Sequence, residues 1–178
     1  MGRWKVIGDV NLYFITTTIV DWQNVFMSLR MFEMVIDSLK CCIVHRRLHL
    51  HGYVIMPNHA HYILSTEQPK ELSEIVRDYN RFTSQQIITQ LGEMHSEEIL
   101  SKFREAATID RRGNSHKVWQ DGFHPIAIET EVFFREKLNY LHENPVRKGF
   151  VELPEHWKFS SARNYISGDH SIINVECL

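Results

Sequence analysis

Two apolar runs on either side of Pro57 constrain the fold of this chain most strongly. Residues 48–56 and residues 59–66 are each long enough for a strand, and only Pro57 and Asn58 separate them. Strands joined by so short a link pair in antiparallel fashion. The sequence therefore predicts an antiparallel hairpin on which the rest of the fold is built.

Further strand-like and helix-like segments surround this hairpin. Residues 12–20, LYFITTTIV, are rich in β-branched and aromatic side chains, which is typical of a strand. Apolar residues recur at steps of three and four across 26–43 and again across 72–82, which predicts two amphipathic helices packed on a core. A short extended segment is expected at 118–128.

A third helix is expected between Thr130 and Asn144. Thr130 is a residue type that caps helix N-termini, and Glu131 would place a negative charge in the first turn, where it is favourable. Pro145 disfavours helical geometry at the residue before it. The helix should therefore end near Asn144.

This order of elements predicts an α+β fold, with a ferredoxin-like antiparallel sheet and helices packed on one face. The 178 residues, 43% of them apolar, fit a single domain spanning 1–178. Residues 92–117 are polar and weakly periodic, and we expect them to be the most mobile. From about residue 151 we expect an irregular C-terminal tail, in which Trp157 and Phe159 pack down.

The composition narrows the functional classes. A formal net charge of −2 gives no overall basic field, so any contact with nucleic acid must come from a local patch. The three cysteines form no metal-binding or disulfide pattern, which fits a reducing cytoplasm. Neither a signal peptide nor a membrane-spanning stretch is recognisable, so we expect a cytoplasmic protein without membrane contact.

His59 and His61 occupy alternate positions of the second hairpin strand. Successive side chains of a strand point to opposite faces, so these two imidazoles point the same way, about 7 Å apart, which suits two ligands of one metal ion. His49 and His51 have the same spacing, and spacing alone does not separate the two pairs. A histidine inside an apolar strand, such as His61, does need a reason to be there.

The predicted third helix carries two separate stripes at 100° per residue. The first consists of Phe133, Lys137, Tyr140 and Asn144. The second is apolar and consists of Phe134, Leu138 and Leu141. Because the core face does not need Tyr140, the first stripe either lines a cleft or faces water.

Four segments resemble, in order, the motif blocks of the REP-associated tyrosine transposases. These belong to the single-tyrosine branch of the HUH endonucleases, together with insertion-sequence transposases that move single-stranded DNA. The segments are YVIMPNHAHYIL (53–64), VWQDGF (118–123), LNYLHENPVRKGFV (138–151) and PEHWKFSSARNY (154–165).

The resemblance implies roles for individual residues. His59 and His61 match the pair that holds a divalent metal, Mg²⁺ or Mn²⁺, and Tyr140 matches the nucleophile. Asn144 matches the position of a glutamine that completes the metal site in insertion-sequence relatives, although its amide is shorter. His49 and His51 match no motif, so we take them as strand residues.

The implied activity is that of a metal-dependent transposase. It would cleave and rejoin hairpin-containing single-stranded DNA through a 5′-phosphotyrosine intermediate. Lys137 would stabilise the phenolate or bind phosphate, or is an ordinary solvated lysine. Trp119 would stack on unpaired bases or belong to the core. The candidates for DNA contact are Arg77, Arg81, Arg111, Arg112, Lys117, Trp119, Arg147 and Lys148.

Two other functions fit the same residues. One is a module that binds hairpin DNA without cutting it, which the intact His59, His61 and Tyr140 argue against. The other is a metal phosphoesterase that activates water, for which Tyr140 would be dispensable. The sequence does not choose between a monomer and a homodimer, since insertion-sequence relatives are dimers and the REP-associated branch can act alone.

Overall fold

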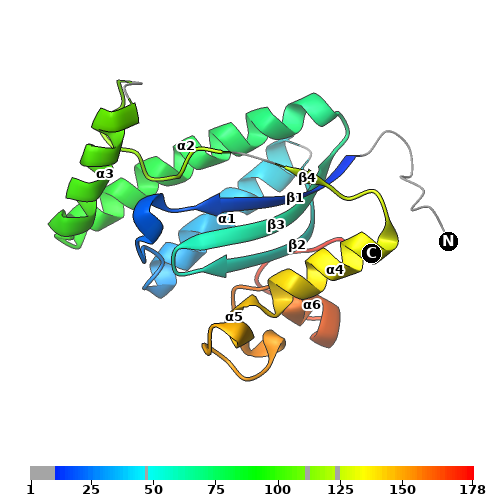
Figure 1. Ribbon diagram of the computed structural model, residues 1–178. Coiled ribbons are helices and arrows are strands. Elements are labelled where there is room, and N and C mark those ends of the chain that lie inside the picture. The colour runs from blue at the N-terminus through cyan, green and yellow to red at the C-terminus, as the bar shows by residue number, and fades with distance from the viewer. Residues whose placement is uncertain (1–10, 47, 111–112, 123–124) are drawn as a thin grey trace.

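A four-stranded antiparallel sheet lies at the centre of the computed structural model, which describes residues 11–46, 48–110, 113–122 and 125–178 (Figure 1). The strand order is β2-β3-β1-β4. The strands are β1 (Asn11–Thr18), β2 (Leu48–Met56), β3 (His59–Thr66) and β4 (Ile126–Ala127). This sheet, with helices packed on it, confirms the predicted α+β fold class.

The predicted hairpin is formed by β2 and β3. Met56 pairs with His59 and Val54 with His61, so the chain reverses at Pro57 and Asn58. On its other side β3 pairs with β1, which places Thr16 opposite His61. β3 is therefore an interior strand, and all eight of its residues are buried.

Two long helices cover one face of the sheet. They are α1 (Leu29–Arg46) and α2 (Pro69–Glu93), and in Figure 1 both lie on the same side of the strands. Alternate residues of β3 point into the core between this face and the helices. These residues are Ala60, Tyr62 and Leu64.

The third predicted helix, α4 (Glu131–His142), covers the opposite face. Its apolar stripe packs with Val54 and Ile63 in a second, smaller core. Our expectation that helices lie on one face therefore holds for α1 and α2 and needs correction for α4. The physical reason is that the sheet also carries large apolar residues on this face, among them Val54, Met56 and Ile63, and a sheet with apolar residues on both faces needs cover on both.

The ends of α4 follow the local sequence. The Oγ1 atom of Thr130 accepts a hydrogen bond from the backbone N–H of Phe133, 3.2 Å away, which confirms the predicted N-cap. After His142 the chain turns into α5 (Asn144–Arg147), with Pro145 at its start.

At Gly52 of β2, an added Cβ would lie 3.0 Å from a methyl carbon of Leu138. The missing side chain thus lets α4 approach β2 closely.

Two further helical elements follow β1 and α2 in the chain. Strand β1 leads into η1 (Val20–Trp22), a single 3-10 turn. Residues 92–117, which we expected to be the most mobile, contain α3 (Glu97–Asp110), which buries an apolar face against the main core. That face consists of Leu100, Phe103 and Ala107.

The C-terminal segment lies along the outer edge of β2. It contains η2 (Pro154–His156) and α6 (Ala162–Ser167), and the backbone N–H of Ile55 donates to Phe159 O at 2.9 Å. Trp157 and Phe159 pack down, as predicted, and the residue they contact is Phe32 of α1. Within the described residues, no helix combines the length and apolarity needed to cross a bilayer.

Candidate active site

His59 and His61 lie side by side on the face of β3 that α4 covers. Their ring centroids are 4.9 Å apart, and each residue is only 6% exposed. The neighbouring residues of β1 on this face are Phe14, whose ring stacks on His61, and Thr16. The alternation of a strand thus gives the parallel orientation that the sequence predicted.

Tyr140 of α4 lies next to this pair. The centroid of its ring is 5.3 Å from that of His61 and 6.0 Å from that of Phe14. The residue is 43% exposed, while Leu138 and Leu141 on the other stripe of α4 are buried. The structure therefore brings together the strand and helix residues that the sequence singled out, and leaves the phenol accessible.

Hydrogen bonds orient both imidazoles. His59 Nδ1 lies 2.7 Å from Asn58 Oδ1, while the Nδ2 of Asn58 donates to Trp22 O and to Asn24 Oδ1. Because the Asn58 oxygen can only accept, His59 Nδ1 carries the proton and Nε2 keeps its lone pair. His61 Nδ1 lies 2.8 Å from Thr16 Oγ1.

Both histidines are held neutral. Burial lowers the pKa of His59 to about 4, and the charge of Lys148 adds to the effect. Burial lowers the pKa of His61 to about 3, with smaller contributions from His59, Arg147 and Lys137. Neutral imidazoles are the form that binds metal ions.

Cations surround Tyr140 and the pair. The guanidinium carbon of Arg147 lies 4.7 Å from the centroid of the Tyr140 ring, and its Nη2 donates to Tyr140 O at 2.5 Å. Lys137 Nζ lies 6.0 Å from the same centroid and contacts the rings of Phe14 and Phe133. Three residues predicted for phosphate or DNA contact, Lys137, Arg147 and Lys148, therefore gather at the histidines.

Asn144 follows α4 and is 5% exposed. No group of three or more histidine, cysteine or acidic side chains suited to a metal occurs in the described part of the chain. Two neutral imidazoles and one amide oxygen are a donor set that fits a divalent ion with open positions.

The second histidine pair is engaged elsewhere. His49 Nδ1 lies 2.7 Å from a carboxylate oxygen of Glu176, and His51 Nδ1 donates to Glu176 O at 3.1 Å. His51 Nε2 accepts from the Ser65 hydroxyl at 2.7 Å. These contacts attach the C-terminal segment to β2, which agrees with the interpretation of this pair as strand residues.

The remaining predicted DNA contacts lie around a groove between α2 and residues 114–122. It has a volume of about 690 Å³ and is lined by Arg77, Arg81, Lys117 and Trp119, among others. Trp119 is 7% exposed, and its Nε1 donates to Asn80 O and Thr83 Oγ1, so it is a core residue with little free ring surface. Arg111 and Arg112 lie outside the described residues.

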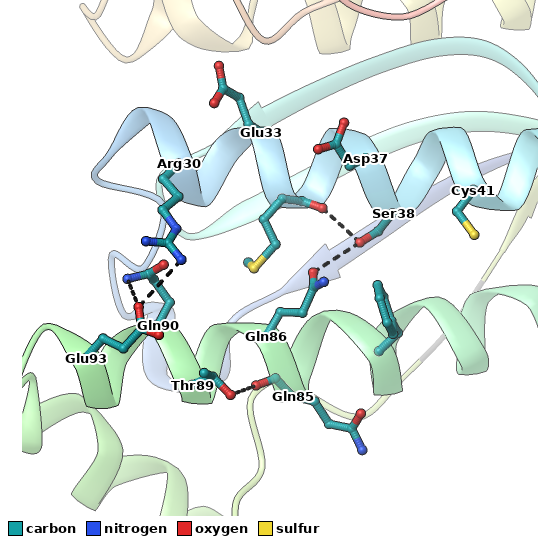
Figure 2. A pocket seen from close by; sticks show the side chains of 12 residues that line it. Arg30, Glu33, Asp37, Ser38, Cys41, Gln85, Gln86, Thr89, Gln90 and Glu93 are labelled. Carbon is teal, nitrogen blue, oxygen red and sulfur yellow. Dashed lines mark hydrogen bonds and ion pairs between the residues drawn. The ribbon is translucent and has the colours of Figure 1, made fainter.

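A second groove, of about 610 Å³, separates α1 from α2 (Figure 2). Its walls carry Ser38 and Gln86, whose side chains are hydrogen-bonded across it, and Arg30, which pairs with Glu93. The groove lies between the helices that cover the other face of the sheet, and none of the predicted site residues lines it.

Sequence reasoning missed the residues that support the histidines. Asn58 and Thr16 hold the imidazoles, and Trp22 of η1 meets His59 edge-on with ring centroids 5.6 Å apart. Asn58 was visible as the residue before His59. Trp22 gave no signal, because an isolated aromatic in a turn belongs to no periodic pattern.

Comparison with solved structures finds proteins of similar fold. The fold is similar to that of a REP-associated tyrosine transposase solved in complex with a REP hairpin, with a TM-score of 0.63 and 17% sequence identity. The match covers 99% of this chain and 92% of that one. No family model matches the sequence, and no curated protein does. At this identity the likeness establishes a shared fold.

Proposed function

We propose that this protein is a DNA-nicking and strand-transfer enzyme that acts on single-stranded DNA containing a hairpin. The observation that carries the proposal is the position of Tyr140, whose exposed phenol lies 5.3 Å, between ring centroids, from a buried pair of neutral histidines. The hairpin-bound neighbour of the same fold supports DNA as the substrate.

In the proposed reaction the Tyr140 oxygen attacks a DNA phosphorus. The bond from phosphorus to the 3′ oxygen breaks, the phenolic proton passes to solvent, and the departing 3′ oxygen takes up a proton. The products are a 5′-phosphotyrosine and a free 3′-hydroxyl. Because one phosphodiester replaces another, the hydroxyl can reverse the step without an energy source.

The surrounding residues hold the reactants. Arg147 and Lys137 flank the phenol ring and would neutralise charge on the phosphate and on the phenolate. His59 and His61, with Asn144, are the residues that would hold Mg²⁺ or Mn²⁺. A bound divalent ion supplies a Lewis acid that withdraws charge from a non-bridging phosphate oxygen. A homodimer is not required, because one chain contributes every residue of this proposal.

Formation of a covalent adduct tests the proposal. Labelled hairpin DNA with unpaired flanks is incubated with the full-length chain and Mn²⁺, and denaturing gels are examined for protein-linked DNA. We expect an adduct for wild type, none for Tyr140→Phe, and none after chelation of the metal. Tyr13→Phe is the matched control, because Tyr13 packs into the core on the opposite face of the sheet.

The alternatives give different results. If wild type binds a varied set of hairpins but never cuts, the protein is a binding module. If Tyr140→Phe cuts as well as wild type, the nucleophile is water and the enzyme is a phosphoesterase. His59→Ala should lose cleavage and retain DNA binding, since its role is to bind the metal.

A further inference from the structure

An exposed tryptophan stands at one end of the row of rings that forms the site. Trp22 is 57% exposed, and its ring centroid lies 5.6 Å from that of His59. The row continues from His59 to His61 at 4.9 Å and from His61 to Tyr140 at 5.3 Å. Trp22 and Tyr140 therefore lie at opposite ends of the same row.

The backbone holds Trp22 in a conformation that is unfavourable for its residue type. Asp21 and Trp22 have φ values of 51° and 54°, in the left-handed region that a Cβ atom disfavours. Two such residues in succession persist only where the surrounding structure enforces them, and such strain concentrates at functional sites.

Contacts from neighbouring elements enforce this turn. Trp22 O accepts from Asn58 Nδ2 at 3.2 Å, and Asp21 O accepts from Gln23 Nε2 at 3.1 Å. The Oε1 of Gln23 accepts in turn from Lys102 of α3 at 3.1 Å. These bonds fix the backbone on both sides of Trp22 and leave its indole in contact with solvent.

Core packing does not account for the indole. Trp119 is buried and Trp157 is partly buried, and their indole N–H groups donate to backbone carbonyls. In the part of the chain that the structure describes, Trp22 has no such acceptor, and most of its surface is open. The turn therefore has an energetically unfavourable backbone conformation, and this conformation keeps an aromatic ring exposed to solvent beside His59.

The chemistry of the site indicates what the ring would bind. Exposed aromatic side chains stack on unpaired bases with little dependence on sequence. Lys148 lies close enough to His59 to influence it electrostatically, so this end of the row attracts an anionic chain. We propose that Trp22 stacks on an unpaired base of the DNA strand, in a nucleotide next to the phosphate that the histidines face. This inference rests on the proposed function, because it takes DNA as the ligand of the site.

Binding measurements in a Tyr140→Phe background test the inference without cleavage. The probes are a labelled DNA hairpin with short unpaired flanks and the same hairpin without flanks. Trp22→Ala should weaken binding to the flanked hairpin on the order of tenfold to a hundredfold and leave the blunt hairpin unaffected. Trp22→Phe should lose less affinity for the flanked hairpin than Trp22→Ala, because phenylalanine keeps an aromatic ring. Phe82→Ala is the matched control, because Phe82 is a 49% exposed aromatic residue of α2 that lines the groove between α1 and α2.

Two further measurements separate stacking from damage to the fold. Trp22→Gly should keep or raise the melting temperature, because glycine accepts a φ near 54°, yet bind flanked DNA as weakly as Trp22→Ala. A second series uses flanked hairpins that each lack one base. Removal of the base that stacks on Trp22 should abolish the difference in affinity between Trp22→Ala and its parent.

Three results would each overturn the inference. They are unchanged affinity of Trp22→Ala for flanked DNA, an equal loss on blunt and flanked hairpins, and a base-removal series in which no position cancels the Trp22 effect. The proposed function is judged separately, from the adduct that wild type forms through Tyr140. If the chain binds flanked DNA through Trp22 but forms no adduct, the inference about stacking holds and the proposed nicking activity is wrong.

Discussion

Tyr140 is held between positive charges that belong to its own helix and to the turn after it. The guanidinium of Arg147 lies over the phenol ring and also donates to the Tyr140 carbonyl, so one side chain contacts both the ring and the backbone of this residue. Lys137 approaches the ring from one turn earlier in α4. The nucleophile proposed here is thus positioned by its neighbours in sequence as well as by the sheet.

Replacing Arg147 by glutamine should slow cleavage. Loss of a cation over an exposed ring is worth about 0.5–1 kcal/mol, and loss of a phosphate contact adds to it, so we expect a rate roughly threefold to tenfold lower. Arg147→Lys should recover part of the rate, since lysine keeps the charge but lacks the planar guanidinium and its forked donors. Single-turnover cleavage assays measure the effect. Arg135→Gln on α4 serves as the control, because Arg135 pairs with Glu131. A wild-type rate in Arg147→Gln would contradict this role.

Asn58 should matter for metal binding although it is not a ligand in the proposed site. Its Oδ1 fixes the tautomer and the orientation of His59. Loss of such a supporting contact typically lowers metal affinity tenfold to a hundredfold. Titration calorimetry with Mn²⁺ should show this loss for Asn58→Ala and none for Asn139→Ala, an exposed position on α4. Equal affinities in both variants would mean that Asn58 does not orient the ligand.

At the scale of single residues, the sequence predicted those whose spacing carries chemistry. His59 and His61 follow from strand alternation, and Tyr140 from a helix stripe that the core does not need. Trp22 could not be predicted in this way, because its exposure depends on two left-handed backbone conformations in succession. Trp119 shows the converse, since an aromatic residue in a motif resembling a DNA-binding family is a core residue here.

At the scale of elements, Ser161 connects the end of α4 to the edge of the sheet. Its hydroxyl lies 2.8 Å from His142 Nε2, and it accepts from the backbone N–H of Tyr53 at 2.9 Å. Ser161 is fully buried, and His142 is the last residue of α4. The C-terminal segment thus helps to set where α4, and with it Tyr140, lies over the sheet.

Ser161→Ala should destabilise the protein by about 1–3 kcal/mol, because it leaves buried polar groups without a partner. Urea unfolding measures this difference. Ser167→Ala, at the exposed end of α6, should change the stability by less than about 0.5 kcal/mol. If the two variants unfold at the same urea concentration, the Ser161 contacts do not fasten α4.

The boundaries of helices and strands could be predicted where the apolar residues followed a clear pattern or a capping residue was present. The hairpin at 48–66 and the N-cap at Thr130 agree with the structure, whereas α3 was missed because only Leu100, Phe103 and Ala107 mark its buried face among many charged residues. The side of the sheet taken by α4 was also missed. The apolar stripe of a helix indicates which side of that helix faces a core, but not which face of the sheet the helix covers. That choice follows from β3, whose residues are all buried, so that the sheet has a core on each face.

At the scale of the whole molecule, the two faces of the sheet have different contents. The face under α1 and α2 holds the larger apolar core. The face under α4 holds a smaller core, and next to it the histidines, the phenol and three cations. With a net charge of only −2, the chain therefore gathers positive charge locally, as a site for an anionic ligand requires.

Acid should destabilise the whole fold, because four buried histidines are neutral in it. Burial lowers the pKa of His59 and His142 to about 4 and that of His61 to about 3, and it also lowers the pKa of His51. In the unfolded chain these groups titrate near 6.5. Below that pH the unfolded state binds protons that the folded state does not, so their stabilising effect is complete above about pH 6.5 and declines as the pH falls toward 4.

Urea unfolding at a series of pH values measures this linkage. Each such histidine can contribute up to about 1.4 kcal/mol per pH unit below its unfolded pKa, so stability should fall by several kcal/mol between pH 7 and pH 5. His51→Gln should reduce the slope, because burial lowers the pKa of His51. This residue is remote from the proposed metal ligands and hydrogen-bonds to Ser65 and to the C-terminal segment. A free energy of unfolding that stays constant across this range would show that the native protein takes up the same protons as the unfolded chain, and that the histidines are not kept neutral by burial.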